Sequence, residues 1–268
     1  MRRGYQIDCA VPFILLHVAC ILVFFVPFRW QYAVLFLITY STRAFGATAG
    51  YHRYFSHRSY KLNRTFQFLI AFLAQTSVQK GILWWAAHHR YHHRHSDDEK
   101  DIHSPVRSGF WWSHIGWILS NDFDDYDSGL IRDFEIYPEL RWLNRYHWLP
   151  SLLLGTTIFA AFGFGAFVWG FVVSTVLLFH ATFSINSLAH VWGSRRYNTK
   201  DHSRNNLFLA LITLGEGWHN NHHRFMHSCR QGLRWWEIDI TYYVLKFLSF
   251  LGIASDLREA DEWRASQS

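Results

Sequence analysis

The sequence is poor in charged residues, cysteine and proline. Charged residues make up 17% of the 268 residues, whereas soluble domains contain roughly 25%. The three cysteines, Cys9, Cys20 and Cys229, are too few and too scattered for a disulfide framework or a cysteine-based zinc site. The five prolines and the absence of any repeat period exclude collagen-like and solenoid proteins. The 50% hydrophobic and 19% aromatic content excludes a disordered chain.

Four apolar segments are long enough to cross a lipid bilayer, which takes roughly 20 residues per helix. Met1 to Arg3 resembles the start of a signal peptide, but no A-x-A-like cleavage site follows, so we expect the first segment to be retained. The uncharged stretch from Trp148 to His190 supplies two crossings, with a turn between Gly163 and Gly170. The predicted spans are residues 11–28, 31–50, 148–168 and 169–190.

The distribution of charge indicates which side of the membrane the polar regions occupy. Nearly all Lys and Arg residues fall on the side that carries both termini, and only Arg29 lies in an opposite loop. This positive-inside pattern places the polar side in the cytoplasm. The net charge of +6 then reflects membrane topology, and we expect no nucleic-acid partner.

The sequence therefore predicts an all-α integral membrane protein with a single domain over residues 1–268. Four transmembrane helices carry a helical cytoplasmic cap formed by residues 51–147 and 191–268. Two further apolar stretches, 66–85 and 235–253, contain amide or charged side chains. We expect both to lie at the membrane surface or to re-enter it rather than to span it.

The 18 histidines form clusters with the spacing of metal ligands. Two H-x-x-H-H sets place three imidazoles each within one roughly 100° helix face, so the two faces can converge on one metal centre. The H-x-x-x-x-H pair, His52 and His57, would diverge by about 140° on an α-helix. We therefore expect these two to reach different metals or to lie at a helix end. The two H-x-x-H-H sets are His89, His92, His93 and His219, His222, His223.

His190 ends the fourth span, with Asn186 one helical turn earlier. With His190, the clusters offer nine imidazoles, which is too many for one octahedral ion and fits two. Imidazole suits iron, zinc, copper and nickel. Carboxylates should support these ligands, and the candidates are Asp97, Asp98, Asp101 and Glu216. His88, His95 and His103 stay open, and we interpret the remaining histidines as structural or surface residues: His17, His114, His147, His180, His202 and His227.

From about Tyr40 to Arg258 the sequence resembles the membrane fatty acyl desaturases, most closely the Δ9 acyl-CoA (stearoyl-CoA) branch in a short, bacterial-type form. The matching motifs are GATAGYHRYFSH, HRYHHRHSDDEKDIHSP, GFWWSHIGWIL, SINSLAH and GEGWHNNHHRF. The resemblance implies a four-span bundle whose cap binds two iron ions, with O2 as co-substrate. It implies these ligands: His52, His57, His89, His92, His93, His190, His219, His222, His223 and, through a water, Asn186.

The resemblance also implies that the acyl chain lies in a kinked tunnel beneath the irons. Thr182, Asn186 and His190 step by four residues along one helix face, which independently fits such a lining. Of the basic residues that contact CoA phosphates in the family, Arg107 alone is matched. The implied substrate-binding residues are Gln79, Trp85 and Thr182 along the tunnel, Tyr40 and Ala44 near its closed end, and Arg107.

The implied activity is the oxygen-dependent introduction of a cis double bond, at Δ9, into a saturated acyl chain. We expect CoA as the carrier, with acyl-carrier protein and a lipid as alternatives. No fused haem domain is visible, so we expect an external electron donor of the ferredoxin or cytochrome type with its reductase. The bacterial cell membrane is the expected location. Two other functions stay open: an acyl-chain hydroxylase with the same centre, and a non-enzymatic metal carrier, although a transporter should place its ligands near the bilayer midplane.

Overall fold

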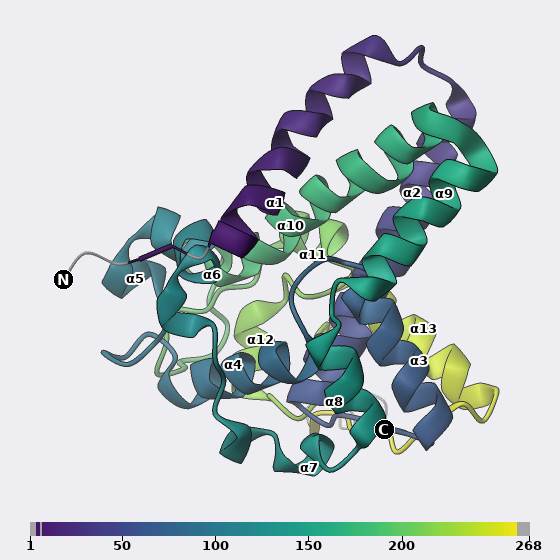
Figure 1. Ribbon diagram of the computed structural model, residues 1–268. Coiled ribbons are helices and arrows are strands. Elements are labelled where there is room, and N and C mark those ends of the chain that lie inside the picture. Colours follow the sequence, from purple (N-terminus) through teal and green to yellow (C-terminus); the bar gives the residue numbers. More distant parts are fainter. Residues whose placement is uncertain (1–3, 6, 262–268) are drawn as a thin grey trace.

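The computed structural model describes residues 4–5 and 7–261 (Figure 1). Long helices form one end of the molecule, and shorter helices and loops form the other. The protein is mostly helical, as the sequence predicts, and the only strands within the described ranges are β1 (Lys61–Leu62) and β2 (Ala254–Ser255), which pair antiparallel. Arg2, Arg3 and Arg264, which contribute to the charge argument, lie outside the described residues.

The long-helix end contains two stretches that are apolar and long enough to cross a membrane, Ile7–Phe25 and Leu149–His190. The first starts four residues before the predicted 11 and ends before Pro27. The second predicted span corresponds to a 16-residue helix, and the four-span topology stays a prediction. The elements here are α1 (Ile7–Ala19), η1 (Cys20–Phe25), α2 (Trp30–Phe45), α9 (Leu149–Phe167), η6 (Val168–Val173) and α10 (Ser174–Asn186).

The apolar stretch 149–190 reverses direction at Gly163, whose φ of 80° and ψ of −178° are not helical. This backbone conformation is accessible mainly to glycine. The turn therefore falls at the start of the predicted window, Gly163 to Gly170. The predicted boundary between the third and fourth spans, 168/169, lies after the observed turn. After the turn the chain folds back, so that Gly155 of α9 faces the rings of Phe167 and Phe171.

The helix α2 continues without a break into η2 (Gly46–Ser56), a fully buried π-helix that leads from the bundle into the cap. Two glycines allow α3 (Arg64–Gln75) to pack closely against it. A Cβ atom at Gly46 would lie 2.9 Å from the backbone of Leu73 and Ala74, and one at Gly50 would lie 3.1 Å from the carbonyl oxygen of Ile70. This packing fixes η2, which carries the first two clustered histidines.

The other cap elements surround η2. The predicted surface stretch 66–85 is split, since α3 ends at Gln75 and α4 begins at Ile82. The C-terminal helix buries Tyr242 and Leu245 and leaves Phe250 85% exposed, the pattern of a surface amphipathic helix. The remaining elements are α4 (Ile82–His95), α5 (Pro105–Ser108), η3 (Trp112–Gly116), α6 (Trp117–Leu119), η4 (Asn121–Phe123), η5 (Ser128–Leu130), α7 (Arg132–Glu135), α8 (Pro138–Arg145), η7 (Leu188–His190), α11 (Leu207–Ile212), α12 (His219–Arg224) and α13 (Ile240–Phe250).

Candidate metal centre

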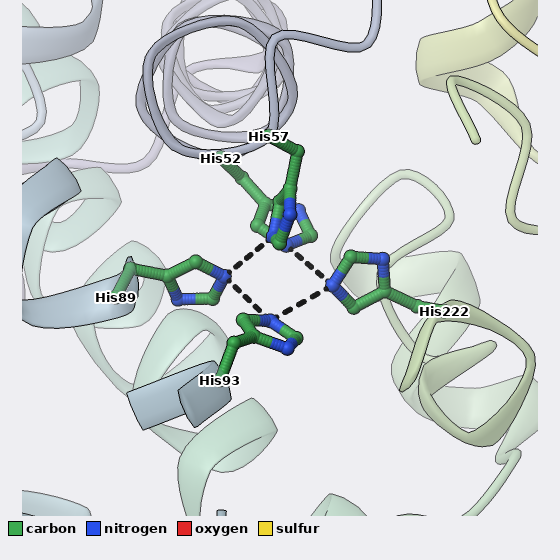
Figure 2. Close-up of side chains that lie close together, drawn as sticks. All are labelled: His52, His57, His89, His93 and His222. Carbon is green, nitrogen blue, oxygen red and sulfur yellow. Dashed lines mark hydrogen bonds between the residues drawn. The ribbon is translucent and has the colours of Figure 1, made fainter. Parts of the chain in front are cut away.

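Five histidines from three helices converge where the cap meets α2 (Figure 2). Their ligand atoms all lie within 4.8 Å of one another. The Nε2 atom of His89 lies 2.9 Å from Nε2 of His57 and 3.0 Å from Nε2 of His93. The Nε2 atom of His222 lies 3.1 Å from those of both His52 and His93. We call these five residues the first histidine group.

The π-helix explains why His52 and His57 lie in the same group. Their ring centroids are 4.7 Å apart, and the backbone N–H of His57 donates to the carbonyl of His52. An i→i+5 hydrogen bond places residues five apart about one turn from each other. The expectation that they reach different metals assumes α-helical spacing and is wrong, although His57 does end the helix as its C-cap residue.

A second group lies beside the first and consists of His92, His190, His219 and His223. The ligand atoms of His92, His190 and His223 lie within 4.8 Å of one another. The Nε2 atom of His219 lies 3.1 Å from Nε2 of His190. The ring centroids of His93 and His223 are 4.5 Å apart, so the groups are adjacent.

The two H-x-x-H-H sets do converge, as the sequence predicts, but each set is divided between the groups. On α4, His89 and His93 belong to the first group, whereas His92 belongs to the second. On α12, His222 belongs to the first group and His223 to the second. On α4, the i and i+4 positions face the first group, and the i+3 position faces the second.

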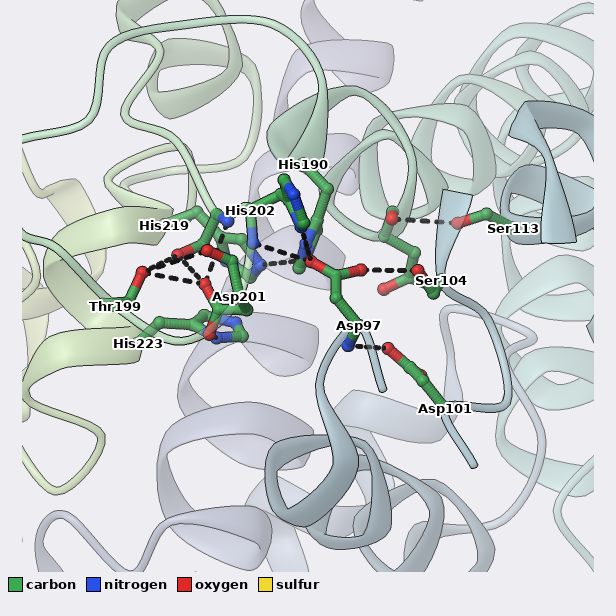
Figure 3. Close-up of polar contacts among 12 residues, drawn as sticks. Asp97, Asp101, Ser104, Ser113, His190, Thr199, Asp201, His202, His219 and His223 are labelled. Carbon is green, nitrogen blue, oxygen red and sulfur yellow. Dashed lines mark hydrogen bonds and ion pairs between the residues drawn. The ribbon is translucent and has the colours of Figure 1, made fainter. Parts of the chain in front are cut away.

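Carboxylates bind the outer nitrogen of four of these imidazoles, and Figure 3 shows the carboxylates that bind His190 and His223. Nδ1 of His190 lies 2.9 Å from Asp97, Nδ1 of His92 lies 3.0 Å from Asp101, and Nδ1 of His223 lies 2.7 Å from Asp201. Nδ1 of His52 pairs with Glu216. Because a carboxylate can only accept, each Nδ1 carries the proton, and the lone pair on Nε2 is left to face its group.

Three of the four predicted supporting carboxylates, Asp97, Asp101 and Glu216, take this role. Asp98 does not, because it faces outward and binds Nδ1 of His95 at 2.9 Å. Asp201 takes its place. Nothing in the sequence marks Asp201, since it is 22 residues from His223.

Burial keeps most of the imidazoles in the neutral form that binds metals. Burial and neighbouring imidazoles hold the pKa values of five members well below 6.5: His57, His89, His93, His219 and His222. Burial likewise lowers the pKa of His223 to about 4. Burial opposes a charge on His92 as well, but the adjacent Asp101 carboxylate raises its pKa above the ordinary value.

The supporting carboxylates stay ionised despite their burial. Burial alone would raise the pKa of Asp97, but hydrogen bonds from His190, Ser104 and the His202 backbone hold it below its usual range. Burial opposes ionisation of Glu216 as well, yet His52 and Arg53 lower its pKa to about 2. Negative charge therefore surrounds the histidine groups.

This donor set fits metal ions. Nε2 of His223 is buried and has no hydrogen-bond partner within the described residues. The Nε2 atoms of the first group lie about 3 Å from one another. Because a neutral imidazole carries only one N–H, these Nε2 atoms cannot all be paired with a donor, and some lone pairs face each other. Bound cations would satisfy these lone pairs. Nine imidazoles with four ionised carboxylates behind them therefore form a donor set suited to imidazole-binding metal ions.

Other buried groups support the site from behind and were not predicted. Arg53, 1% exposed, donates to Glu216 and forms an ion pair with Asp239. His103, one of the three histidines whose role the sequence leaves open, stacks on His92 with ring centroids 4.2 Å apart. The sequence could indicate His103 by its position in the second box, whereas Arg53 and Asp239 carry no local signal.

A cavity reaches the first histidine group from the end of the molecule that carries the long apolar helices. Its larger part has a volume of about 740 Å³ and is lined by His89, Gln79, Trp85, Thr182 and Asn186, among others. Gln79 donates a hydrogen bond of 3.0 Å from Nε2 to Thr182 Oγ1, which ties the α3–α4 loop to α10. These predicted tunnel residues, and Asn186, therefore meet at the cavity beside the histidines.

A smaller part of about 50 Å³ continues beneath the histidines and is lined by His52, Trp85, Thr182 and Ala44. Trp85, His89, Thr182 and Asn186 line both parts, so the two adjoin at these residues. Ala44 packs with Leu178 and Leu214 against Tyr40. The Tyr40 hydroxyl donates to the carbonyl of Ile212 at 2.7 Å. Tyr40 does not line either part of the cavity as the described residues form it, and its place at the closed end stays a prediction.

Arg107 does not line the cavity as the described residues form it. Its Nε donates to the backbone carbonyl of Asp97 at 3.1 Å, behind the second histidine group. This position gives no evidence for a role in binding CoA phosphates. The hydrogen bond instead stabilises the segment that carries Asp97.

Comparisons with known proteins identify the family. The family model described as fatty acid desaturase matches residues 10–248. The chain is 38% identical to "Acyl-CoA C20 Delta5-desaturase" of Anemone leveillei, over 92% of this chain and 80% of that protein. It is 35% identical to "Delta-9 acyl-lipid desaturase 1" of Arabidopsis thaliana, over 97% of this chain and 87% of that protein.

Another relative is "Palmitoyl-monogalactosyldiacylglycerol delta-7 desaturase, chloroplastic" of Arabidopsis thaliana, 38% identical over 88% of this chain and 64% of that protein. These relatives are plant proteins, and a bacterial source stays a prediction. Their names include CoA-bound and lipid-bound acyl chains and three positions of the double bond. All are desaturases and hence oxidoreductases. Together with the histidine groups, these matches show that the chain is an enzyme that belongs to the fatty acid desaturase family.

Proposed function

We propose that the protein introduces a cis double bond, at Δ9, into a saturated acyl chain, with two iron ions held by its nine clustered histidines. The observation that carries the proposal is the cavity, whose smaller part is lined by His52 and His89 together with apolar residues such as Ala44. A cavity lined in this way can hold an acyl chain beside the histidine groups. A metal carrier has no use for it.

Two bound iron ions would supply the activation of O2 and the removal of both hydrogens. The overall reaction balances when –CH2–CH2–, O2, two electrons and two protons give –CH=CH– and two water molecules. An external ferredoxin- or cytochrome-type carrier with its reductase supplies the electrons. The basic cytoplasmic face would attract an acidic donor.

The residues of the chain hold and orient the reactants. His52, His92, His190 and His223 present Nε2 because their Nδ1 atoms are bound to carboxylates. The Gln79–Thr182 hydrogen bond fixes two lining residues of the cavity relative to each other. Trp85 stacks on His89 with ring centroids 4.9 Å apart, so an apolar wall lies directly beside the group that would bind iron. This wall excludes water from the reacting carbons.

The test is the analysis of fatty acids in a host that expresses the chain, with double-bond positions mapped by mass spectrometry. We expect a new Δ9 monoene that disappears in His93→Ala. His95→Ala is the matched control, since His95 lies in the same box but pairs with the exposed Asp98. A hydroxylated chain would favour a hydroxylase. No product after a ferredoxin and its reductase are supplied, with two irons bound, would contradict the proposal.

A further inference from the structure

Three histidines outside the two histidine groups are joined by hydrogen bonds that lead from the bundle into the cap. Nε2 of His17 on α1 lies 3.0 Å from Nε2 of His180 on α10. Nδ1 of His180 lies 3.0 Å from Nε2 of His114 on η3. Nδ1 of His114 lies 2.8 Å from the hydroxyl of Ser187, the residue directly after α10. We call these three imidazoles the histidine chain.

The hydrogen bonds of the histidine chain run in one direction, because the chain starts at a backbone carbonyl. Nδ1 of His17 lies 2.7 Å from the carbonyl oxygen of Phe13, which only accepts, so Nδ1 carries the proton and Nε2 keeps its lone pair. A neutral imidazole has one N–H, so His180 donates from Nε2 to His17 and accepts at Nδ1 from His114. His114 in turn accepts at Nδ1 from the Ser187 hydroxyl.

The surroundings of the histidine chain favour its neutral form. Burial and the neighbouring His180 lower the pKa of His114 to about 4. The Phe183 ring lies beside both, with its centroid 5.9 Å from that of His114 and 6.3 Å from that of His180. The Phe183 carbonyl lies 3.0 Å from the Ser187 hydroxyl, but it already accepts from the backbone N–H of Ser187. The hydroxyl proton can therefore serve His114, and the neutral chain is fully paired.

At the cap end, the histidine chain holds the turn that leads to His190. α10 ends at Asn186, and η7, which ends at His190, follows after Ser187. Ser113, which also belongs to η3, donates from its hydroxyl to the Asn186 carbonyl at 2.9 Å. The Ser187 carbonyl accepts from the backbone N–H of His190 at 3.3 Å. η3 therefore binds both residues at which α10 gives way to η7, the element that directs His190 into the second histidine group.

At the other end, the histidine chain holds α1 against α10 (Figure 1). None of the residues of α1, 7 to 19, is buried, so apolar packing against the rest of the protein is slight. A hydrogen bond between helices in apolar surroundings gives such a helix a fixed contact. Leu16 next to His17 and Phe179 next to His180 both line the larger part of the cavity. The histidine chain thus connects a wall of the cavity to the turn before His190.

The histidine chain is a fixed link rather than a proton path, because its last N–H ends on the Phe13 carbonyl, which cannot pass a proton on. We propose that its three imidazoles are positioning residues for His190. They hold the turn at Ser187 in the place from which Nε2 of His190 faces the second histidine group, 3.1 Å from Nε2 of His219. The assignment rests on the metal centre of the function proposed above, but it concerns metal binding and not turnover.

Cobalt binding by the full chain tests this assignment without turnover. Co2+ accepts imidazole ligands as iron does, and its visible absorption bands report the geometry of each site. Chelator-treated protein is titrated with Co2+ against a competing chelator. Asp201→Asn, which removes the carboxylate behind His223, identifies the binding step and the bands of the second group. In His180→Leu we expect the affinity of this step to fall about tenfold, with a shift of the same bands and no change in those of the first group.

Three further variants make the test specific. His180→Gln should restore the wild-type affinity and bands, because its amide offers an N–H to His17 and a carbonyl to His114, the order that the histidine chain requires. Ser187→Ala removes the last donor of the chain and should reproduce His180→Leu, also where the leucine variant does not fold. Thr156→Val is the control in the bundle, since the Thr156 hydroxyl bonds to carbonyls of its own helix, α9, and should change neither affinity nor bands.

Wild-type affinity and bands in Ser187→Ala or in folded His180→Leu would overturn the assignment. A loss in His180→Gln as large as in His180→Leu would overturn the fixed link and favour a chain that carries protons, because an amide keeps the hydrogen bonds but does not relay a proton. An equal loss in Thr156→Val would show a general effect on the bundle and would also overturn it. A wild-type protein that binds fewer than two Co2+ ions would instead contradict the metal centre of the proposed function, whatever the variants do.

Discussion

Asp201 Oδ2 lies 2.7 Å from Nδ1 of His223, and 22 residues separate the two in sequence. Ser203 and Thr199 donate to the other oxygen of the carboxylate, which fixes its orientation (Figure 3). Burial alone would raise the pKa of Asp201, but the bond from His223 holds it below its usual range. The carboxylate therefore sets the tautomer of His223 and directs its unpartnered Nε2 toward the second histidine group.

Asp201→Asn should weaken iron binding at the second group by about 10- to 100-fold, the usual effect of losing a carboxylate behind a ligating imidazole. The amide can donate a hydrogen to Nδ1 and so favour the wrong tautomer. The measurement is iron content after dialysis against graded chelator. Asp98→Asn is the control, since Asp98 binds only the outer His95. Equal iron content in Asp201→Asn and the wild type would contradict the role.

Ala44→Leu should shift the products toward shorter acyl chains. Ala44 is 1% exposed and lines the smaller part of the cavity together with His52. Three added carbons would occupy space that the end of a chain needs, because the neighbouring Leu178 and Leu214 are already packed against it. Chain-length analysis of the monoenes in an expressing host measures the shift. Ala33→Leu, on the same helix but outside the cavity lining, should leave the profile unchanged.

The sequence predicts the members of the metal centre but not their arrangement. The three histidine boxes are local patterns, so the nine residues can be identified from spacing and resemblance. Which imidazoles share a group depends on the π-helical bond between His57 and His52, and no residue type specifies such a bond. The division of the H-x-x-H-H sets follows from where α4 and α12 face each other, which is a property of the whole cap.

The carboxylates that contact the centre from distant parts of the sequence could not be predicted for the same reason. Asp201 and Asp239 support the centre across loops, and a sequence does not reveal which distant carboxylate reaches which imidazole or arginine. Asp98 was a reasonable candidate by proximity to the second box, yet its position on the turn after α4 directs it outward. The turn at Gly163 was predictable within a window, because several glycines follow one another there.

The metal-free protein should lose stability as pH falls below about 6.5. Burial holds the pKa values of most of these imidazoles below this value in the folded state, to about 4 for His223 and about 3 for His103. The unfolded chain binds these protons near pH 6.5, so below that pH the unfolded state carries more protons and is favoured. Stability is therefore retained above pH 6.5 and falls between pH 6.5 and 4.

The measurement is the unfolding temperature of chelator-treated protein at pH 7.5 and 5.5. We expect a clear decrease at pH 5.5, and a smaller decrease when iron is bound, because bound metal competes with protons for Nε2. An unfolding temperature that is the same at both pH values in the chelated protein would contradict the neutral state of the buried histidines.

Arg43 should contribute strongly to the stability of the helix bundle. It is 1% exposed in α2, and within the part of the chain that the structure describes no carboxylate lies within ion-pair distance of it. Its guanidinium donates to the Thr76 carbonyl at 3.0 Å, the Ser174 hydroxyl at 2.9 Å and the Thr175 hydroxyl at 2.6 Å. The side chain thus joins α2 to the α3–α4 loop and to the start of α10.

Arg43→Met keeps much of the volume but leaves three buried acceptors without their donor. Each such loss costs about 1–3 kcal/mol, so we expect the free energy of unfolding to fall by roughly 3 kcal/mol or more. Arg43→Lys should recover part of it, because an ammonium can reach some but not all of the acceptors. Arg29→Met is the control, since Arg29 is exposed and only approaches the Tyr32 ring. A similar fall in apparent Tm for Arg29→Met and Arg43→Met would show that the charge, and not this set of hydrogen bonds, stabilises the bundle.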